Sequence, residues 1–230
     1  MTRIKICGIS DEAAAAAAAE AGADAIGLIF AASRRQVDAS RARRIAAALP
    51  PFVTKVGVVV NEPLDRLRAL VEAVRLDAVQ LHGDEGPAYC QAVRDAGVTV
   101  IKAIRVAGPL DAARLRALPV AAVLLDTHRP GVRGGTGEPF DWRWAVPVAS
   151  AMPVILSGGL SPENVAAGIA AVRPYGVDVS SGVETDGRKD PGKIRAFVAA
   201  VRAADARLAA GGPKPPTPPV QDAPPGEDCR

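Results

Sequence analysis

The stretch that decides the fold is VILSGGLSPENVAAGIAAVRPYGVDVSSGVE, residues 154–184. It begins with a short aliphatic run, turns at Gly158 and Gly159, continues as an Ala-rich segment of helical period and ends in a second aliphatic run. Short apolar runs bounded by turn residues are typical of buried strands, whereas the longer periodic segment is typical of a helix. Residues 154–184 therefore predict a strand, a helix and a second strand parallel to the first.

The same unit recurs along the chain at intervals of about 22 residues. Strands are predicted at 4–7, 25–30, 55–60, 78–82, 100–105, 122–126, 154–157 and 177–181. Helices are predicted near 11–22, 38–49, 63–75, 84–96, 109–117, 141–149, 161–172 and 190–208. Eight strands, each followed by a helix, predict a single α/β domain, a (β/α)8 TIM barrel over residues 1–210. An open doubly wound sheet is the alternative, but it usually has fewer strands and a GxGxxG turn after the first strand, where this chain has CGISD at 7–11.

Residues 211–230 are rich in proline and cannot build a core, so they predict a disordered C-terminal tail. The formal charge is only +3 and aromatic residues make up 3% of the chain, which argues against a nucleic-acid partner. We find no signal peptide and no apolar run of membrane-spanning length, so we expect a cytoplasmic protein without a membrane partner.

The three cysteines are Cys7, Cys90 and Cys229, and the chain has two histidines. Their spacing matches neither a zinc site nor a disulfide scaffold, so we expect no metal site and a reducing compartment.

In a barrel of this kind the chemistry lies at the carboxyl ends of the strands. Gly158 and Gly159 follow the seventh strand, and Ser181 and Gly182 end the eighth. Two such turns at these positions predict a phosphate cradle, because bare backbone N–H groups can approach an anion closely. The alternative is that the glycines only permit tight turns.

Cys7 ends the first strand, and strand alternation turns Lys5 to the same side, where its charge could favour the thiolate. A buried thiol can also be a small hydrophobic residue, the interpretation that we give to Cys90. Asp126 ends the sixth strand, where a carboxyl group in a dry pocket can act as an acid but can equally cap a turn or pair with an arginine. The glycine-bearing loop at 127–137 is a candidate lid.

Eight segments resemble, in order, the phosphoribosylanthranilate isomerase family, and the likeness runs from residue 4 to about residue 204. They are KICGIS (5–10), GLIF (27–30), VGVVVN (56–61), VQLHGDE (79–85), LLDT (124–127), GGTGEPFDW (134–142), LSGGLSPENV (156–165) and GVDVSSGVE (176–184). The resemblance implies an isomerase of tryptophan biosynthesis that needs no cofactor. Its reaction is the Amadori rearrangement of N-(5-phosphoribosyl)anthranilate to 1-(2-carboxyphenylamino)-1-deoxyribulose 5-phosphate.

The resemblance also implies roles for individual residues. Cys7 would be the general base and Asp126 the general acid, and the phosphate would bind at Gly158, Gly159, Ser181 and Gly182. Asp178 would face inward, near the substrate or as a partner for Lys5. The carboxylate of the anthranilate would pair with an arginine, for which Arg35 is the first choice and Arg34 the second.

The expected partner is a small phosphoribosyl substrate, and the chain could be a monomer or a homodimer. Two competing functions remain open. A related isomerase acts on a phosphoribosyl-formimino aminoimidazole carboxamide, but it has an Asp where this chain has Cys7. The second is a barrel that binds a sugar phosphate without catalysis.

Overall fold

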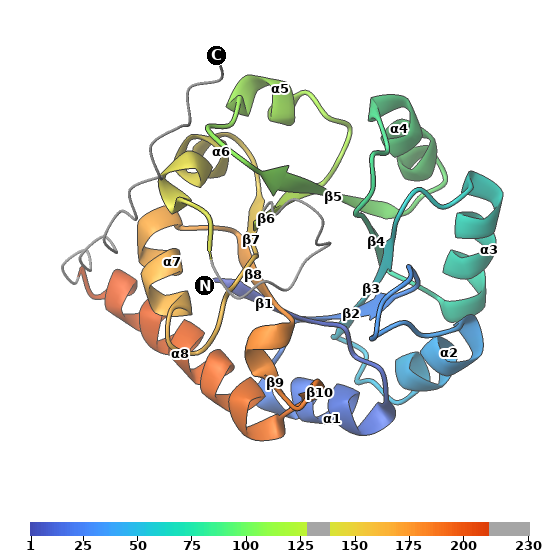
Figure 1. The fold of residues 1–230 in the computed structure, drawn as a ribbon, viewed down its shortest axis with the longest axis horizontal. Coiled ribbons are helices and arrows are strands. Elements are labelled where there is room, and N and C mark those ends of the chain that lie inside the picture. The colour runs from blue at the N-terminus through green and yellow to red at the C-terminus, as the bar shows by residue number, and fades with distance from the viewer. Residues whose placement is uncertain (128–138, 212–230) are drawn as a thin grey trace, which may run out of the picture.

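The computed structural model describes residues 1–127 and 139–211. Eight parallel strands form a closed barrel in chain order, and the eighth strand pairs with the first (Figure 1). The strands are β1 (Arg3–Cys7), β2 (Ala25–Ile29), β3 (Thr54–Val59), β4 (Ala78–Leu81), β5 (Thr99–Val106), β6 (Ala122–Thr127), β7 (Val154–Leu156) and β8 (Gly176–Val179). The predicted TIM barrel is therefore confirmed.

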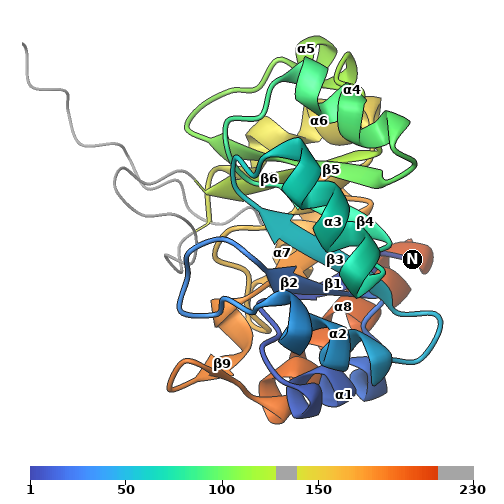
Figure 2. The same cartoon turned by 90° about the vertical axis from the view of Figure 1, so that its right-hand side faces the viewer.

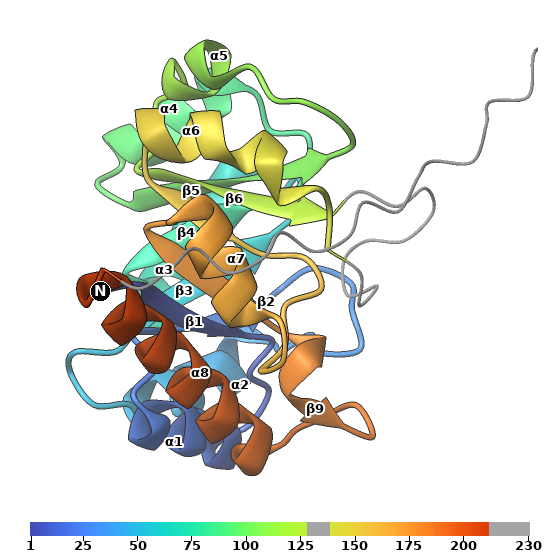
Figure 3. The same ribbon diagram turned by 90° about the vertical axis from the view of Figure 1, so that its left-hand side faces the viewer.

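Helices surround the barrel in Figure 1 and run along its outside in Figures 2 and 3. They are α1 (Glu12–Ala21), α2 (Ala39–Ala47), α3 (Leu64–Val74), α4 (Pro87–Asp95), α5 (Ala112–Arg116), α6 (Val146–Ala151), α7 (Val165–Val172), α8 (Pro191–Ala209) and the 3-10 helices η1 (Trp142–Ala145) and η2 (Ser181–Val183). Within the described part of the chain, no helix is long and apolar enough to cross a membrane. The predicted tail beyond residue 211 and the candidate lid beyond residue 127 lie outside the described residues.

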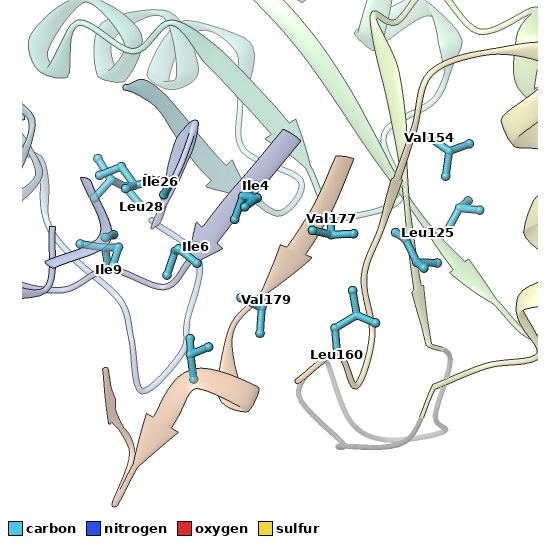
Figure 4. Close-up of a cluster of buried hydrophobic side chains, with 14 of the residues drawn as sticks. Ile4, Ile6, Ile9, Ile26, Leu28, Leu125, Val154, Leu160, Val177 and Val179 are labelled. Carbon is cyan, nitrogen blue, oxygen red and sulfur yellow. The ribbon is translucent and has the colours of Figure 1, made fainter. Parts of the chain in front are cut away.

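The alternation of side chains along the strands divides an outer apolar core from the inside of the barrel. On β1, Ile4 and Ile6 are fully buried and pack towards the helices, together with Val177 and Val179 of β8 (Figure 4). Lys5, between the two isoleucines, faces inward and is in register with Asp178 of β8. The inner layer consists mainly of aliphatic side chains: Val56, Ala78, Ile101, Ala103, Ala122, Leu124 and Ile155.

Two segments near the carboxyl ends of the strands differ from the prediction. Strand β8 ends at Val179, two residues earlier than predicted, because Ser180 leaves extended geometry with φ −124° and ψ −83° and Ser181 begins η2. Helix α7 begins at Val165 rather than near residue 161, because Asn164 Oδ1 accepts from the backbone N of Ser161 at 2.9 Å and closes a turn there.

A small hairpin after η2 was not predicted. It consists of β9 (Glu184–Thr185) and β10 (Arg188–Lys189), and Lys189 pairs with Glu184. Asp186 and Gly187 join the two strands with φ of 51° and 77°, the positive angles of a two-residue hairpin turn. The Asp-Gly pair was therefore a usable signal in the sequence. Figures 2 and 3 place β9 at the end of the barrel opposite the N-terminus.

Candidate active site

Cys7 ends β1 with its thiol against Gly27 of β2. A Cβ added to Gly27 would lie 2.8 Å from Sγ of Cys7, so the glycine provides the space that the thiol occupies. Cys7 is buried and unpaired. Burial raises the pKa of the thiol, and the charge of Asp178 raises it further, whereas the charges of Lys5 and Lys189 lower it. Burial prevails, so the pKa of Cys7 lies above its ordinary value. The charge of Lys5 thus favours the thiolate, as expected, but the desolvation of the thiolate outweighs the nearby ammonium groups.

Lys5 and Asp178 form a buried ion pair inside the barrel. Lys5 Nζ donates to Asp178 Oδ1 at 2.7 Å, and the two side chains are 5% and 6% exposed. Ser157 Oγ donates to the other carboxylate oxygen at 3.3 Å. Burial lowers the pKa of Lys5, but Asp178 and Cys7 outweigh it, so this pKa lies above its ordinary value. Of the two expectations for Asp178, the pairing with Lys5 is the one that the geometry realises directly.

Asp126 lies at the end of β6 in a row with two polar side chains, Gln80 of β4 and His82 of the loop after β4. Its Oδ1 accepts from the backbone N of Thr127 at 2.9 Å, and Nε2 of His82 lies 3.4 Å from its Oδ2. The other ring nitrogen of His82 lies 2.8 Å from Nε2 of Gln80. Asp126 is buried while His82 is partly exposed, so the row leads from the barrel interior to the rim.

The two glycine turns after β7 and β8 contact each other. The first also lies against Asp126, and the second lies next to a residue that contacts Cys7. Gly158 has φ 80°, and a Cβ there would lie 3.0 Å from Oδ1 of Asp126. Gly182 lies so close to the carbonyl of Leu160 that a Cβ would collide with it. Next to the second turn, Ser180 Oγ donates to the carbonyl of Cys7 at 3.1 Å. The turns therefore bridge the space between Asp126 and Cys7.

Arg35 and Arg34 lie differently in the loop after β2. The aliphatic stem of Arg35 lies directly over Gly8, beside Cys7, and its side chain is only 14% exposed. Arg34 is 59% exposed and extends towards Gly187 of the hairpin. Arg35 is thus the arginine on the barrel side of this loop.

The sequence of the chain resembles those of known proteins over most of its length. A family model described as N-(5'phosphoribosyl)anthranilate (PRA) isomerase matches residues 4–200. The chain belongs to the PRA isomerase family. Its relatives include proteins named N-(5'-phosphoribosyl)anthranilate isomerase from Desulforudis audaxviator, 50% identical over 89% of this chain and 100% of the relative, and from Pseudomonas fluorescens Pf-5, 55% identical over 87% and 95%.

Solved structures of PRA isomerases have the same fold. The phosphoribosyl anthranilate isomerase of Thermotoga maritima is 41% identical, with a TM-score of 0.82 over 88% of this chain and 100% of that chain. A PRA isomerase in complex with reduced 1-(o-carboxyphenylamino)-1-deoxyribulose 5-phosphate is 40% identical, with a TM-score of 0.79 over the same shares. The predicted family is therefore confirmed.

In this member of the PRA isomerase family, the site residues predicted from the sequence lie together at one end of the barrel. Further side chains, which the sequence did not single out, lie beside them. His82 beside Asp126, and Glu184 and Lys189 of the hairpin, received no predicted role. His82 follows β4, and no local pattern indicates that it lies next to a side chain on β6. Cys90 is fully buried in the outer core, as expected for a small apolar residue.

Two further features lie outside this set. A cavity of about 600 Å³ lies at the opposite end of the barrel, lined by residues at the strand starts such as Ala25, Thr99 and Gly176, and contains none of the predicted site residues. Among the residues that the structure describes, no group of three or more His, Cys, Asp or Glu side chains could hold a metal ion.

Proposed function

We propose that this chain catalyses the Amadori rearrangement of its family, the isomerisation of N-(5-phosphoribosyl)anthranilate in tryptophan biosynthesis, with Asp126 as general acid and Cys7 as general base. The observation that carries the proposal is the bridge of two glycine turns, of which one touches Asp126 and the other lies beside Cys7. A phosphate bound on these turns would hold the ribose between an acid and a base.

In the first step, the Asp126 carboxyl protonates the ring oxygen of the ribose, and the ring opens to an iminium. The loss of this proton leaves a carboxylate, to which His82 Nε2–H can donate from its place 3.4 Å away. A positioned acid typically contributes about 10²–10⁴ in rate.

In the second step, the Cys7 thiolate removes the proton from C2, and the enolamine that results tautomerises to the ketone. Burial keeps the pKa of Cys7 above its ordinary value in the unliganded protein. The positive charge of the iminium favours the thiolate once the substrate has reacted in the first step, since an opposite charge nearby stabilises the charged form. The thiolate, the form that removes the proton, is thus favoured when the iminium is present.

The two ends of the substrate would be held by different parts of the mouth. The backbone at Gly158, Gly159, Ser181 and Gly182 would receive the phosphate. Arg35, on the barrel side of its loop, would receive the anthranilate carboxylate, and Asp178 would act from below, through its ion pair with Lys5 and hence on Cys7.

The experiment is a fluorescence assay for the consumption of phosphoribosylanthranilate by the purified protein, with Cys7→Ala and Asp126→Asn as variants. We expect kcat to fall by about 10²–10⁴ in each variant, with binding of the reduced product analogue retained. No turnover by wild type, with binding of the reduced product analogue retained, would support a barrel that only binds sugar phosphates, whereas unchanged kcat in both variants would refute the roles of Cys7 and Asp126. Turnover of the aminoimidazole carboxamide substrate alone would point to the related isomerase.

The proposed partner is thus a small phosphoribosyl substrate, and the proposed location is the cytoplasm. The Thermotoga maritima relative is described as dimeric, and one of its structures as that of mutually generated monomers. For this chain, a monomer and a homodimer are both proposed states, to be separated by light scattering of the purified protein.

A further inference from the structure

The carboxylate of Glu184 holds the guanidinium of Arg35 from behind. Arg35 Nε donates to Oε1 at 2.6 Å and Nη2 donates to Oε2 at 2.8 Å, a bidentate pair between side chains that are 14% and 4% exposed. Such a pair fixes the plane of the guanidinium as well as its position. The pair occupies the edge formed by Nε and Nη2, and Nη1 donates to neither oxygen of Glu184 in it.

Two more cations share the same carboxylate. Lys189 Nζ donates to Oε1 at 2.8 Å and is 2% exposed, and Arg34 Nη2 donates to Oε2 at 2.7 Å from an exposed side chain. Burial raises the pKa of Glu184, but hydrogen bonds from Arg35 and Lys189 outweigh it, so this carboxyl has a pKa below its ordinary value. Glu184 is therefore an anion at neutral pH.

The hairpin that carries Glu184 and Lys189 is itself held at several points. Lys193 Nζ donates to the carbonyl of Glu184 at 2.7 Å, and Thr185 Oγ1 donates to Asp190 Oδ2 at 2.8 Å. Lys189 Nζ also donates to the carbonyl of Ser180 at 2.9 Å, next to the turn proposed for the phosphate. The position of Arg35 is thus tied to the body of the barrel rather than to its own loop alone.

The charges explain why a second buried cation accompanies the pair. A carboxylate alone would neutralise Arg35 and weaken its attraction for another anion. With Lys189 on the same carboxylate, the buried part of the cluster holds two cations and one anion and keeps an excess positive charge. The cluster thereby combines a fixed guanidinium with a field that attracts a carboxylate.

We propose that Glu184 is a positioning residue that orients Arg35 for the carboxylate of the substrate, and that Lys189 compensates its charge. The inference rests on the proposed function, in which Arg35 receives that carboxylate. Glu184 itself does not touch the substrate. It contacts Arg35 instead, and this contact fixes the orientation of the guanidinium.

The test compares two inhibitors in wild type and in Glu184→Gln. One is reduced 1-(o-carboxyphenylamino)-1-deoxyribulose 5-phosphate, and the other is the same compound with an unsubstituted phenyl ring. The dissociation constants are measured by isothermal titration calorimetry. We expect the variant to bind the carboxylate compound about tenfold to a hundredfold more weakly, the usual effect of losing hydrogen bonds to a charged group. The compound without the carboxylate should bind almost equally well to both proteins, and KM should rise more than kcat falls.

A general structural role for Glu184 predicts that both inhibitors lose the same factor, and that result would overturn the inference, as would unchanged binding of both. Glu184→Asp keeps the charge with a shorter reach and should recover part of the loss, and it takes the place of Glu184→Gln if that variant fails to fold. Glu12→Gln is the control, since Glu12 pairs with Arg44 between two exposed side chains 3.2 Å apart and lies outside the site.

The outcome is separable from that of the proposed function. If wild type does not turn over phosphoribosylanthranilate, the proposed function fails, whatever Glu184 does. If wild type is active and prefers the carboxylate inhibitor, but Glu184→Gln keeps that preference in full, only the role of Glu184 fails.

Discussion

Replacing Lys5 by Met would leave Asp178 as a buried carboxylate without its cation. At the Nζ–Oδ1 separation of 2.7 Å, two unit charges attract by about 6 kcal/mol at an effective dielectric constant of about 20. The desolvation of both groups offsets part of this, and removal of one partner of a buried pair typically costs about 3–5 kcal/mol. Ser157 can relieve little of that cost, since its hydroxyl lies 3.3 Å from the other carboxylate oxygen.

Urea unfolding at pH 7 measures this loss. The pKa of Lys5 is raised in the folded protein, so its contribution to stability is complete below the unfolded pKa of about 10.4 and is lost only as the pH rises through the folded value. We therefore expect the full decrease of about 3–5 kcal/mol in the free energy of unfolding at pH 7. Lys5→Met/Asp178→Asn removes both charges and should recover most of it.

Lys55→Met is the matched control, because Lys55 also lies on a strand, β3, but its Nζ pairs with the exposed carboxylate of Asp77 at 2.8 Å. An exposed pair of this kind contributes about 0–1 kcal/mol. A stabilising buried pair would be refuted if Lys5→Met costs no more than Lys55→Met, or if the double variant is as unstable as Lys5→Met. A second readout is catalytic, since loss of the Lys5 charge should raise the pKa of Cys7 and move the rise of kcat/KM to higher pH.

Three further predictions concern the site and the base of the barrel. Gly158→Ala forces an alanine to φ 80°, with its Cβ against the side chain and backbone N of Thr127 and then against Asp126. We therefore expect a stability loss of about 1–3 kcal/mol and a kcat lower by up to about 10², whereas Gly86→Ala, with open space around it, should change kcat little. If Cys7 is the base, its raised pKa means that kcat/KM increases with pH through neutrality, and a flat profile from about pH 6 to 9 would contradict this assignment. Burial raises the pKa of Asp24, but Arg3, the backbone of Ile4 and Arg202 lower it below its ordinary value. The stability difference between wild type and Asp24→Asn should therefore be complete above about pH 5 and shrink as the pH falls towards about 3. A constant difference in urea unfolding over that pH range would contradict this prediction.

The sequence by itself determined the fold and the identity of most candidate residues. The repeated strand and helix periods predict a barrel because each unit can bury its apolar face only by closing with its neighbours. Strand parity correctly placed Lys5 on the same side of β1 as Cys7, since successive side chains on a strand point to opposite faces. The rule that function lies at the carboxyl ends of the strands then selected Cys7 and Asp126.

The tertiary structure alone decided how these residues are held. Arg35 contacts Glu184 across 149 positions of sequence, and His82 contacts Asp126 from another strand, so no local pattern encodes either pair. The pKa of Cys7 was beyond the sequence for the same reason, because it depends on how completely the folded barrel removes water from the thiol. Local periodicity specifies which elements form, whereas closure of the barrel brings distant side chains together and sets their charge.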